Sequence, residues 1–190
     1  MKYIILDLEA TCWEKKDRQP NEITEIGAVC IDENQNTLGE FNSFSKPVVH
    51  SELSDFCTKL TSITQTDVDT APEFPEVLKN FQDWIESFND DYFLCSWGFY
   101  DRVQFKNDCV LHKLDINWLE NHISLKHQYG KIKKKRPIGM KKALKKENMF
   151  LEGTHHRGID DARNIAKIFV KYFDDWDFNP PKKKESKSSL

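Results

Sequence analysis

The chain has 190 residues, of which 38% are hydrophobic, 31% are charged and 12% are aromatic. One domain of this length buries a substantial core, a second full domain does not fit, and the composition excludes a disordered or fibrous chain. The formal net charge of -3 is unusual for a protein that handles nucleic acid, but the distribution of charge matters more than its sum. Nine of the 28 lysines and arginines lie within residues 131–146, a segment without acids.

The five cysteines are widely spaced and form no C-x-x-C pair, so the sequence indicates neither a disulfide framework nor a cysteine zinc site. We therefore expect a reducing compartment, the cytoplasm. The apolar run at the N-terminus is interrupted by Asp7 and Glu9 before it reaches the length of a signal peptide. No stretch approaches the roughly 18 uncharged apolar residues of a membrane span, and we expect no membrane contact.

The first part of the chain predicts a three-stranded antiparallel meander, with strands at 2–10, 22–32 and 37–46 separated by turn-rich stretches. Short helices are predicted at 53–60 and 64–69. A longer amphipathic helix follows at 72–88, because its apolar residues recur at three- and four-residue spacing.

The second part of the chain alternates strand and helix. A strand at 92–97 ends at Gly98, and helical spacing follows at Val103, Phe105, Cys109, Val110 and Leu114. Further helices are predicted at 138–148 and 160–176. This order indicates an α/β domain over residues 1–178, with a mixed central sheet flanked by helices. Residues 179–190 are too polar to pack, and we expect a disordered tail.

Asp7 and Glu9 stand two residues apart in an otherwise apolar strand. Side chains alternate along a strand, so both carboxylates point to the same face. Buried and unpaired, each would lose several kcal/mol of solvation, and their mutual repulsion would add to this loss. The pair therefore predicts a divalent-metal site; the alternative is two surface acids on an edge strand.

Two further sites carry acids at helix starts. Asp101 follows the strand 92–97 after a turn, where α/β sheets often place ligand-binding groups. A role as N-cap or as partner of the helix dipole is an open alternative. Residues 155–162 read His-His-Arg-Gly-Ile-Asp-Asp-Ala and lead into the last predicted helix. We expect one of Asp160 and Asp161 to cap this helix and the other to point into a site. A histidine five residues earlier can then lie over whatever that acid binds.

Together these three segments resemble the motifs of the DEDDh 3'-to-5' exonucleases. The motif D-x-E matches Asp7-Leu8-Glu9, the second motif contributes a single Asp that matches Asp101, and H-x4-D matches His156 to Asp161. The spacing selects His156 over His155 and Asp161 over Asp160. Each motif alone is common by chance, but the three in this order and context are specific.

Further segments resemble the Eri-type exoribonucleases, the enhanced-RNA-interference and histone-mRNA 3'-end group. Residues 6–12 (Leu-Asp-Leu-Glu-Ala-Thr-Cys) look like the opening motif of that branch, and residues 53–65 and 158–166 are similar to later ones. The likeness covers about residues 2–173. Larger relatives carry an additional nucleic-acid-binding domain, and Tyr100 stands where several have Trp. These departures bear on substrate choice rather than on the reaction.

The resemblance implies an RNase H-like exonuclease fold and hydrolysis of single-stranded RNA from the 3' end to 5'-nucleoside monophosphates. It implies two Mg²⁺ or Mn²⁺ ions, which activate water and neutralise the leaving oxygen; carboxylates are the hard oxygen ligands that such ions prefer. The ligands would be Asp7, Glu9, Asp101 and Asp161, with His156 as general base. The nucleotide would contact Phe56 and Tyr100 by stacking, and backbone groups at Ala10 and Thr11.

Several alternatives stay open at this point. Single-stranded DNA is a second candidate substrate. The sequence does not decide which proteins, if any, are partners, or what the oligomeric state is. A polymerase-proofreading or oligoribonuclease-type enzyme is one alternative, and a catalytically silent nucleic-acid-binding module is another. A silent module is expected to lack a ligand, whereas all five candidate residues are present. The basic segment 131–146 either binds the strand or is a solvated helix face.

Overall fold

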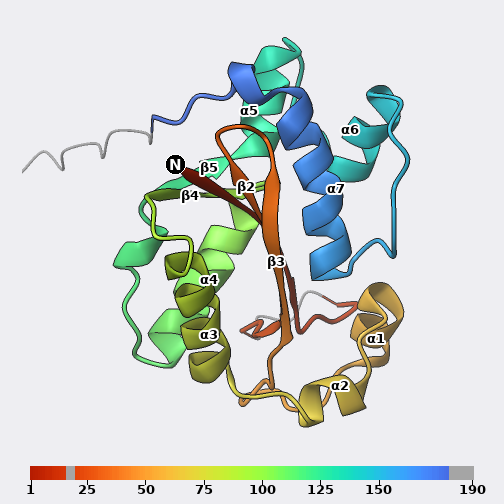
Figure 1. The fold of residues 1–190 in the computed structure, drawn as a ribbon. Helices are drawn as coiled ribbons and strands as arrows, with labels where there is room; N and C mark the ends of the chain where they lie inside the picture. Colours follow the sequence, from red (N-terminus) through yellow and green to blue (C-terminus); the bar gives the residue numbers. More distant parts are fainter. Residues whose placement is uncertain (16–19, 180–190) are drawn as a thin grey trace, which may run out of the picture.

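The computed structural model describes residues 1–15 and 20–179 and contains a five-stranded mixed sheet in the order β3-β2-β1-β4-β5 (Figure 1). The strands are β1 (Lys2–Ala10), β2 (Ile23–Asp32), β3 (Thr37–Phe44), β4 (Tyr92–Ser96) and β5 (His122–Ser124). The α-helices are α1 (Asp55–Thr61), α2 (Gln65–Asp69), α3 (Phe74–Glu86), α4 (Tyr100–Leu111), α5 (Leu125–Ile132), α6 (Met140–Lys146) and α7 (Gly158–Lys171). Two short 3-10 helices span Asn117–Leu119 and Phe173–Asp175.

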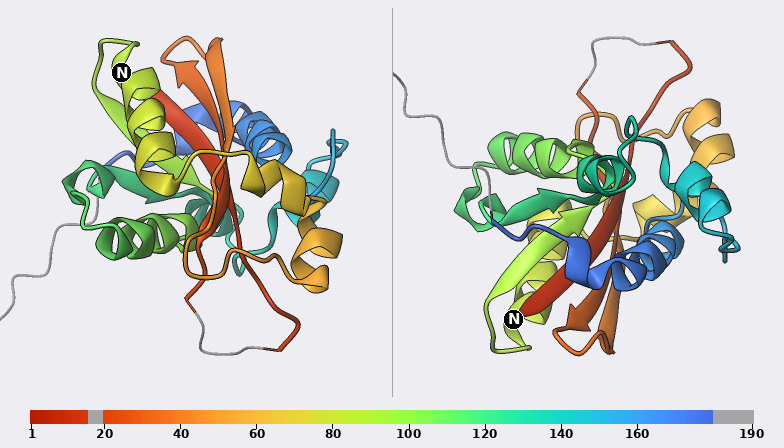
Figure 2. Two further views of the ribbon diagram at one scale, coloured as in Figure 1. Left: turned by 90° about the horizontal axis from the view of Figure 1, so that it is seen from below. Right: turned by 90° about the horizontal axis from the view of Figure 1, so that it is seen from above.

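Helices cover both faces of this sheet, with α3 and α4 on one face and α7 on the other (Figure 2). The alternation of β1 divides the core accordingly. Ile4, Leu6 and Leu8 pack toward α3 and α4, whereas Tyr3 and Ile5 pack toward α5, α6 and α7. Odd-numbered side chains of β1 therefore face α7.

The structure confirms the predicted mixed sheet and its antiparallel meander: β1 pairs with β2 and β2 with β3 in antiparallel fashion, while β4 adds to β1 in parallel. The sequence missed β5 and α5. β5 has only three residues, and α5 contains His127 and Gly130, so neither shows a clear apolar period. The predicted helix 138–148 corresponds to α6, which is shorter at both ends. The predicted helix 160–176 begins earlier, at Gly158, and ends at Lys171.

The helix predicted from the apolar spacing after Gly98 is confirmed as α4. Two of the apolar residues in that spacing, Val103 and Val110, are nevertheless exposed. The buried face carries the polar residues Asp101, Gln104 and Asp108 beside Phe105. These polar side chains bond to groups at the end of β1 and the start of β2, such as Ile23 N–H, so burial here follows polar contacts rather than hydrophobicity.

The predicted tail at 179–190 lies outside the described residues, apart from Asn179. In the ranges 1–15 and 20–179, no helix is long and apolar enough to cross a membrane.

Close backbone contact fixes the start of α7 on the sheet. Gly27 of β2 faces α7, and a Cβ added there would lie 2.1 Å from the carbonyl carbon of Gly158 and from Ile159 N. A Cβ at Gly158 would in turn lie 3.1 Å from the carbonyl oxygen of Asp7. The two glycines therefore bring the first turn of α7 next to the C-terminal half of β1.

We expect Gly27→Ala to destabilise the protein by about 1–3 kcal/mol or more, because α7 must move away from the sheet to accommodate the methyl group. Urea unfolding followed by circular dichroism measures the loss. Gly39→Ala is a matched control in β3, since its Cβ would meet nothing closer than Phe88 at 3.5 Å. Equal stability of both variants and the natural protein would contradict the close contact.

Candidate active site

Three carboxylates from two distant parts of the chain meet where α7 approaches β1. Asp7 and Glu9 project from β1 toward α7, and Asp161 projects from the first turn of α7. Each offers a carboxylate oxygen, and these oxygens all lie within 4.8 Å of one another. Because β1 is the central strand, with β2 and β4 on its two sides, the alternative of surface acids on an edge strand is excluded.

Asp101 joins this group from the other face of the sheet. β4 runs parallel to β1, so the two strands end at the same edge, and α4 begins four residues after β4. Asp101 is only 5% exposed, and its Oδ1 accepts a hydrogen bond of 3.2 Å from Leu8 N–H, between the two acids of β1. The N-cap of α4 is Phe99. The N-cap alternative for Asp101 is therefore wrong.

A buried ion pair anchors the N-terminus of α7 beside these acids. Glu25, which pairs with Glu9 in the register of β1 and β2, is fully buried. Its Oε2 accepts hydrogen bonds from Arg157 Nε at 3.1 Å and from Gly158 N–H at 2.9 Å. A charged acceptor at a helix N-terminus satisfies a free N–H and interacts favourably with the helix dipole. Glu25 thereby holds the helix that carries Asp161.

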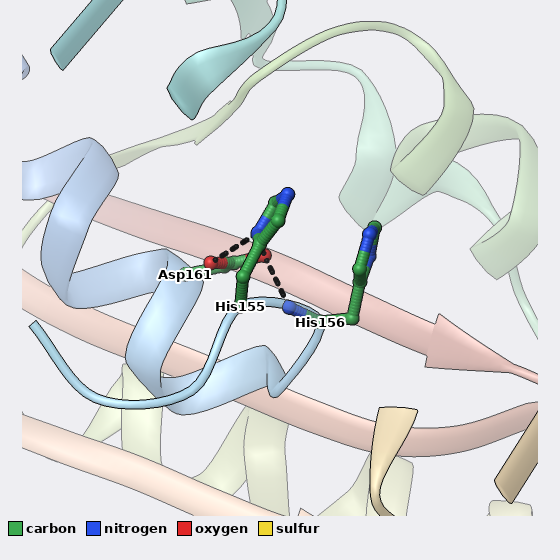
Figure 3. A group of neighbouring side chains, drawn as sticks. All are labelled: His155, His156 and Asp161. Atoms are coloured by element: carbon green, nitrogen blue, oxygen red, sulfur yellow. Dashed lines mark hydrogen bonds and ion pairs between the residues drawn. The ribbon is translucent and has the colours of Figure 1, made fainter. Parts of the chain in front are cut away.

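The two histidines contact Asp161 in different ways (Figure 3). His155 Nδ1 lies 2.9 Å from Asp161 Oδ2, so its ring is tied to the carboxylate. His156 donates its backbone N–H to the same oxygen at 3.0 Å, and its backbone has a φ of 66°. No hydrogen bond joins the His156 imidazole to any group in the described part of the chain, but the ring stacks on that of His155 with centroids 4.0 Å apart. The His156 ring nitrogens are thus available to other molecules.

Asp160 differs from its predicted role. We expected one of the two aspartates to cap the last helix, but its N-cap is Arg157. Asp160 instead accepts a hydrogen bond from Thr154 N–H at 2.8 Å and pairs with Arg163 at 3.1 Å. It therefore closes the loop before α7, while Asp161 points to the other acids as expected.

Burial, with repulsion between neighbouring carboxylates, raises pKa values in this cluster. Burial raises the pKa of Asp7 well above its ordinary value, and the charges of Asp101, Glu9 and Asp161 raise it further. Burial, helped by the charge of Asp161, raises the pKa of Glu9 to about 8. Burial also raises the pKa of Asp101, against the hydrogen bond from Leu8. Without cations the cluster therefore binds protons near neutral pH.

This shift predicts how the stability of the metal-free protein depends on pH. Between its ordinary pKa of 4.5 and the folded value of about 8, Glu9 binds more protons in the folded than in the unfolded state. The free energy of unfolding therefore falls as the pH rises through this window, by on the order of a few kcal/mol. Urea unfolding from pH 5 to pH 8 in chelator measures the fall. We expect Glu9→Gln to flatten it, and an unchanged slope in that variant would contradict the assignment.

The acids form one wall of a cavity of about 580 Å³. The structure places six of the candidate site residues on its walls: Asp7, Glu9, Asp101, His156, Asp161 and Tyr100. The remaining lining residues were not predicted: Leu8, Trp97, Gly139, Met140, Lys141, Lys142 and His155. Lys141 and Lys142 belong to the basic segment, so part of that segment does face the cavity. No sequence motif predicted that Trp97 lines the cavity. Its position at the end of the predicted strand 92–97 was the one available signal.

Three predicted nucleotide-binding residues lie outside the cavity lining. Ala10 and Thr11 are buried, and Thr11 Oγ1 accepts a hydrogen bond from Glu22 N–H at 2.9 Å. Phe56 is on α1, where 38% of its surface is exposed. Contacts of these three residues with a nucleotide stay predictions. Tyr100 is half-exposed on the cavity wall, where an aromatic ring can stack on a base.

Comparison with known proteins gives relatives over the whole fold. A family model described as Exonuclease (RNase_T) matches residues 4–169. The 3'-5' exoribonuclease 1 of Homo sapiens is 34% identical over 183 residues, which cover 90% of this chain and 52% of the human protein. The ERI1 exoribonuclease 2 of Danio rerio is 32% identical over 193 residues, covering 90% and 35% of the two chains. The chain thus spans about half the length of the former relative and about a third of the latter.

Solved structures agree with this result. The nuclease domain of 3'hExo, a DEDDh family member bound to rAMP, superposes with a TM-score of 0.90 at 30% identity, covering 95% of this chain and 96% of that domain. A 3'-exonuclease that recognises the 3' end of a histone mRNA stem-loop gives a TM-score of 0.88 at 30% identity, with coverage of 92% and 82%. The fold is therefore the RNase H-like fold of these nucleases. Its sheet, its acidic cluster and these relatives agree: the chain belongs to the exonuclease family, in the Eri-type branch of the DEDDh exonucleases.

Proposed function

We propose that this protein is a 3'-to-5' exoribonuclease that removes 5'-nucleoside monophosphates from single-stranded RNA with two Mg²⁺ or Mn²⁺ ions. The observation that carries the proposal is the convergence of Asp7, Glu9 and Asp161 within 4.8 Å, with Asp101 on the same cavity. The family depends on divalent metal ions. The relatives named as 3'-5' exoribonucleases support the reaction.

The four acids fit divalent ions with hard oxygen preferences. All four offer carboxylate oxygens, and burial raises the pKa values of Asp7, Glu9 and Asp101. Such ions, when bound, activate water and stabilise the charge of the leaving oxygen. Asp7, Glu9, Asp101 and Asp161 would hold them, and Glu25 with Arg157 keeps Asp161 in place for this role.

His156 is suited to take the proton from the attacking water. Burial and the neighbouring His155 lower its pKa below the ordinary value of 6.5, so the imidazole is neutral at physiological pH. Its ring lines the cavity and has no protein hydrogen-bond partner among the described residues. A neutral imidazole within reach of the water can act as general base. His155, with its Nδ1 already bound to Asp161, instead orients that carboxylate.

The rest of the cavity suits a terminal nucleotide. Tyr100 and Trp97 offer aromatic surface for a base, and Lys141 and Lys142 bring positive charge to a cavity otherwise dominated by acids. Stacking of this kind tolerates any base, which agrees with stepwise removal of successive nucleotides. The structure of 3'hExo holds rAMP, a product of the same class.

Incubation with end-labelled single-stranded RNA and DNA of equal sequence tests the proposal. We expect release of 5'-mononucleotides from the 3' end of RNA with Mg²⁺ or Mn²⁺ and none with chelator. Faster hydrolysis of DNA than of RNA would overturn the substrate class. Hydrolysis only of very short chains would favour the oligoribonuclease-type alternative, and binding without hydrolysis in either metal would favour the silent module. A cytoplasmic location stays a prediction, which imaging of the tagged protein can check.

A further inference from the structure

A second groove lies beside the candidate active site. It has a volume of about 570 Å³ and runs along α5 and the loop that follows it. Its lining consists of His127, Gly130, Lys131, Lys134, Lys135, Arg136 and Pro137. Four of these seven side chains are cationic, and none of the described residues that line the groove is acidic. The groove is therefore a concentrated positive surface on a chain whose net charge is negative.

One continuous stretch of chain contributes to the lining of both the groove and the active-site cavity. Arg136 and Pro137 line the groove, and Gly139, two residues later, lines the cavity. Trp97 Nε1 donates a hydrogen bond of 3.0 Å to the carbonyl oxygen of Ile138, between them. On the groove side, Lys135 N–H donates to the carbonyl oxygen of Gly130 at 2.8 Å. The segment 135–138 is therefore held in place on both sides.

Most of the positive charge in the groove is not used within the fold. The side chains of Lys134, Lys135 and Arg136 are exposed and make no ion pair or hydrogen bond to any described side chain. Lys133 is different: its Nζ pairs with Glu147 at 3.0 Å and bonds to the Tyr172 hydroxyl at 2.8 Å. The structure thus separates one lysine that holds the fold together from neighbours that are free to bind phosphates.

An aromatic surface lies between the two hollows. Phe99, which is 46% exposed, stacks on His127 of the groove with ring centroids 4.8 Å apart, and its chain neighbour Tyr100 lines the cavity. Nonspecific binding of single strands combines a positive groove along the backbone with aromatic rings on which bases stack. Here the aromatic rings are Tyr100 and Phe99, and the positive groove adjoins Phe99 through His127.

We propose that this groove, with Phe99 at its entrance, binds the part of a single-stranded RNA that lies 5' of the nucleotide being removed. The proposal rests on the proposed exoribonuclease function and adds a consequence: the enzyme binds long strands more tightly than short ones. The acids of the cavity are matched by the proposed metal ions, so additional affinity for a long strand comes from positive charge outside the cavity. Binding through phosphates releases counterions and depends steeply on salt concentration.

The test compares the variant Lys134→Gln/Lys135→Gln/Arg136→Gln with the natural protein; Lys133 stays unchanged because it pairs with Glu147. Binding of an RNA of about 20 nucleotides is measured across a salt series in chelator, which prevents cleavage. We expect the slope of log K against log salt to fall by about 0.7 for each lost phosphate contact, or about 2 in total. Turnover of a dinucleotide with Mg²⁺ should not change, because a dinucleotide does not reach the groove. A control of equal charge is Lys79→Gln/Lys106→Gln/Lys113→Gln around α3 and α4. Lys79 forms an exposed ion pair with Asp83, a kind of pair that contributes little to stability.

The outcomes separate the two proposals. An unchanged salt slope in the groove variant, or an equal loss in the control variant, overturns the groove, while hydrolysis by the natural protein leaves the exoribonuclease function standing. A natural protein that hydrolyses neither the dinucleotide nor the long RNA overturns the proposed function itself. A lower turnover of the dinucleotide in the groove variant would also overturn the groove, since it would mean that these residues act at the cavity.

Discussion

Asp7→Ala and Glu9→Ala should each lower the rate of RNA hydrolysis by about 10³-fold or more, because loss of a metal ligand removes several kcal/mol of charge stabilisation in the transition state. The same variants should be as stable as the natural protein, or more stable, when metal is removed. Each substitution takes away a buried carboxylate that is repelled by its neighbours, as the raised pKa values of Asp7 and Glu9 indicate. Hydrolysis of labelled RNA and thermal unfolding in chelator measure the two effects.

Asp108→Asn is the control for this pattern. Asp108 is buried, and it accepts hydrogen bonds from Ile23 N–H and Gln104 Nε2, but it does not line the cavity. We expect the reverse result, with lower stability and unchanged turnover of the folded protein. If Asp7→Ala or Glu9→Ala lowered the melting temperature in chelator as Asp108→Asn does, the two acids would be structural partners rather than metal ligands.

His156→Ala should lower turnover by about 10²- to 10⁴-fold, the usual contribution of general-base catalysis, with little change in metal binding. Because His156 has a φ of 66°, His156→Asn is a useful second variant, since Asn adopts this conformation more readily than Ala. The acid limb of the pH–rate profile, below pH 6.5, reports protonation of the imidazole whose pKa lies below that value. We expect this limb to disappear in both variants.

His155→Ala provides the comparison. His155 contacts Asp161 through Nδ1, but Asp161 keeps the hydrogen bond from the His156 backbone. The variant should therefore lose far less activity and keep the acid limb. A larger loss in His155→Ala than in His156→Ala would reverse the assignment of the general base.

The clustered acids could be predicted because they interrupt strong local patterns. Asp7 and Glu9 break a run of apolar strand residues, and Asp161 stands at a fixed distance after His156 at a helix start. The sequence alone thus predicted that Asp7 and Glu9 share one face of their strand, and the structure shows that this face meets α7.

The contacts that the sequence could not reveal are those set by loop conformation and long-range packing. The ring of His155 reaches Asp161 because the loop turns at His156 with a positive φ, and no spacing rule predicts this turn. Lys133 looks like any other lysine of the basic segment, yet it pairs with Glu147, 14 residues later in the sequence. Val103 and Val110 belong to the apolar spacing that predicted α4, yet both are exposed. Polar contacts with the ends of β1 and β2 decide which side of α4 is buried.

The packing of the first turn of α7 against β1 also determines when activity can appear during synthesis of the chain. The carboxylates of Asp7 and Glu9 are synthesised long before Asp161 and the glycine contact at Gly158. Pairing of such distant segments pays a large loop-closure entropy and is slow to form. We therefore expect a nascent chain that ends before residue 158 to be without nuclease activity, because the carboxylate of Asp161 has not yet joined those of Asp7 and Glu9.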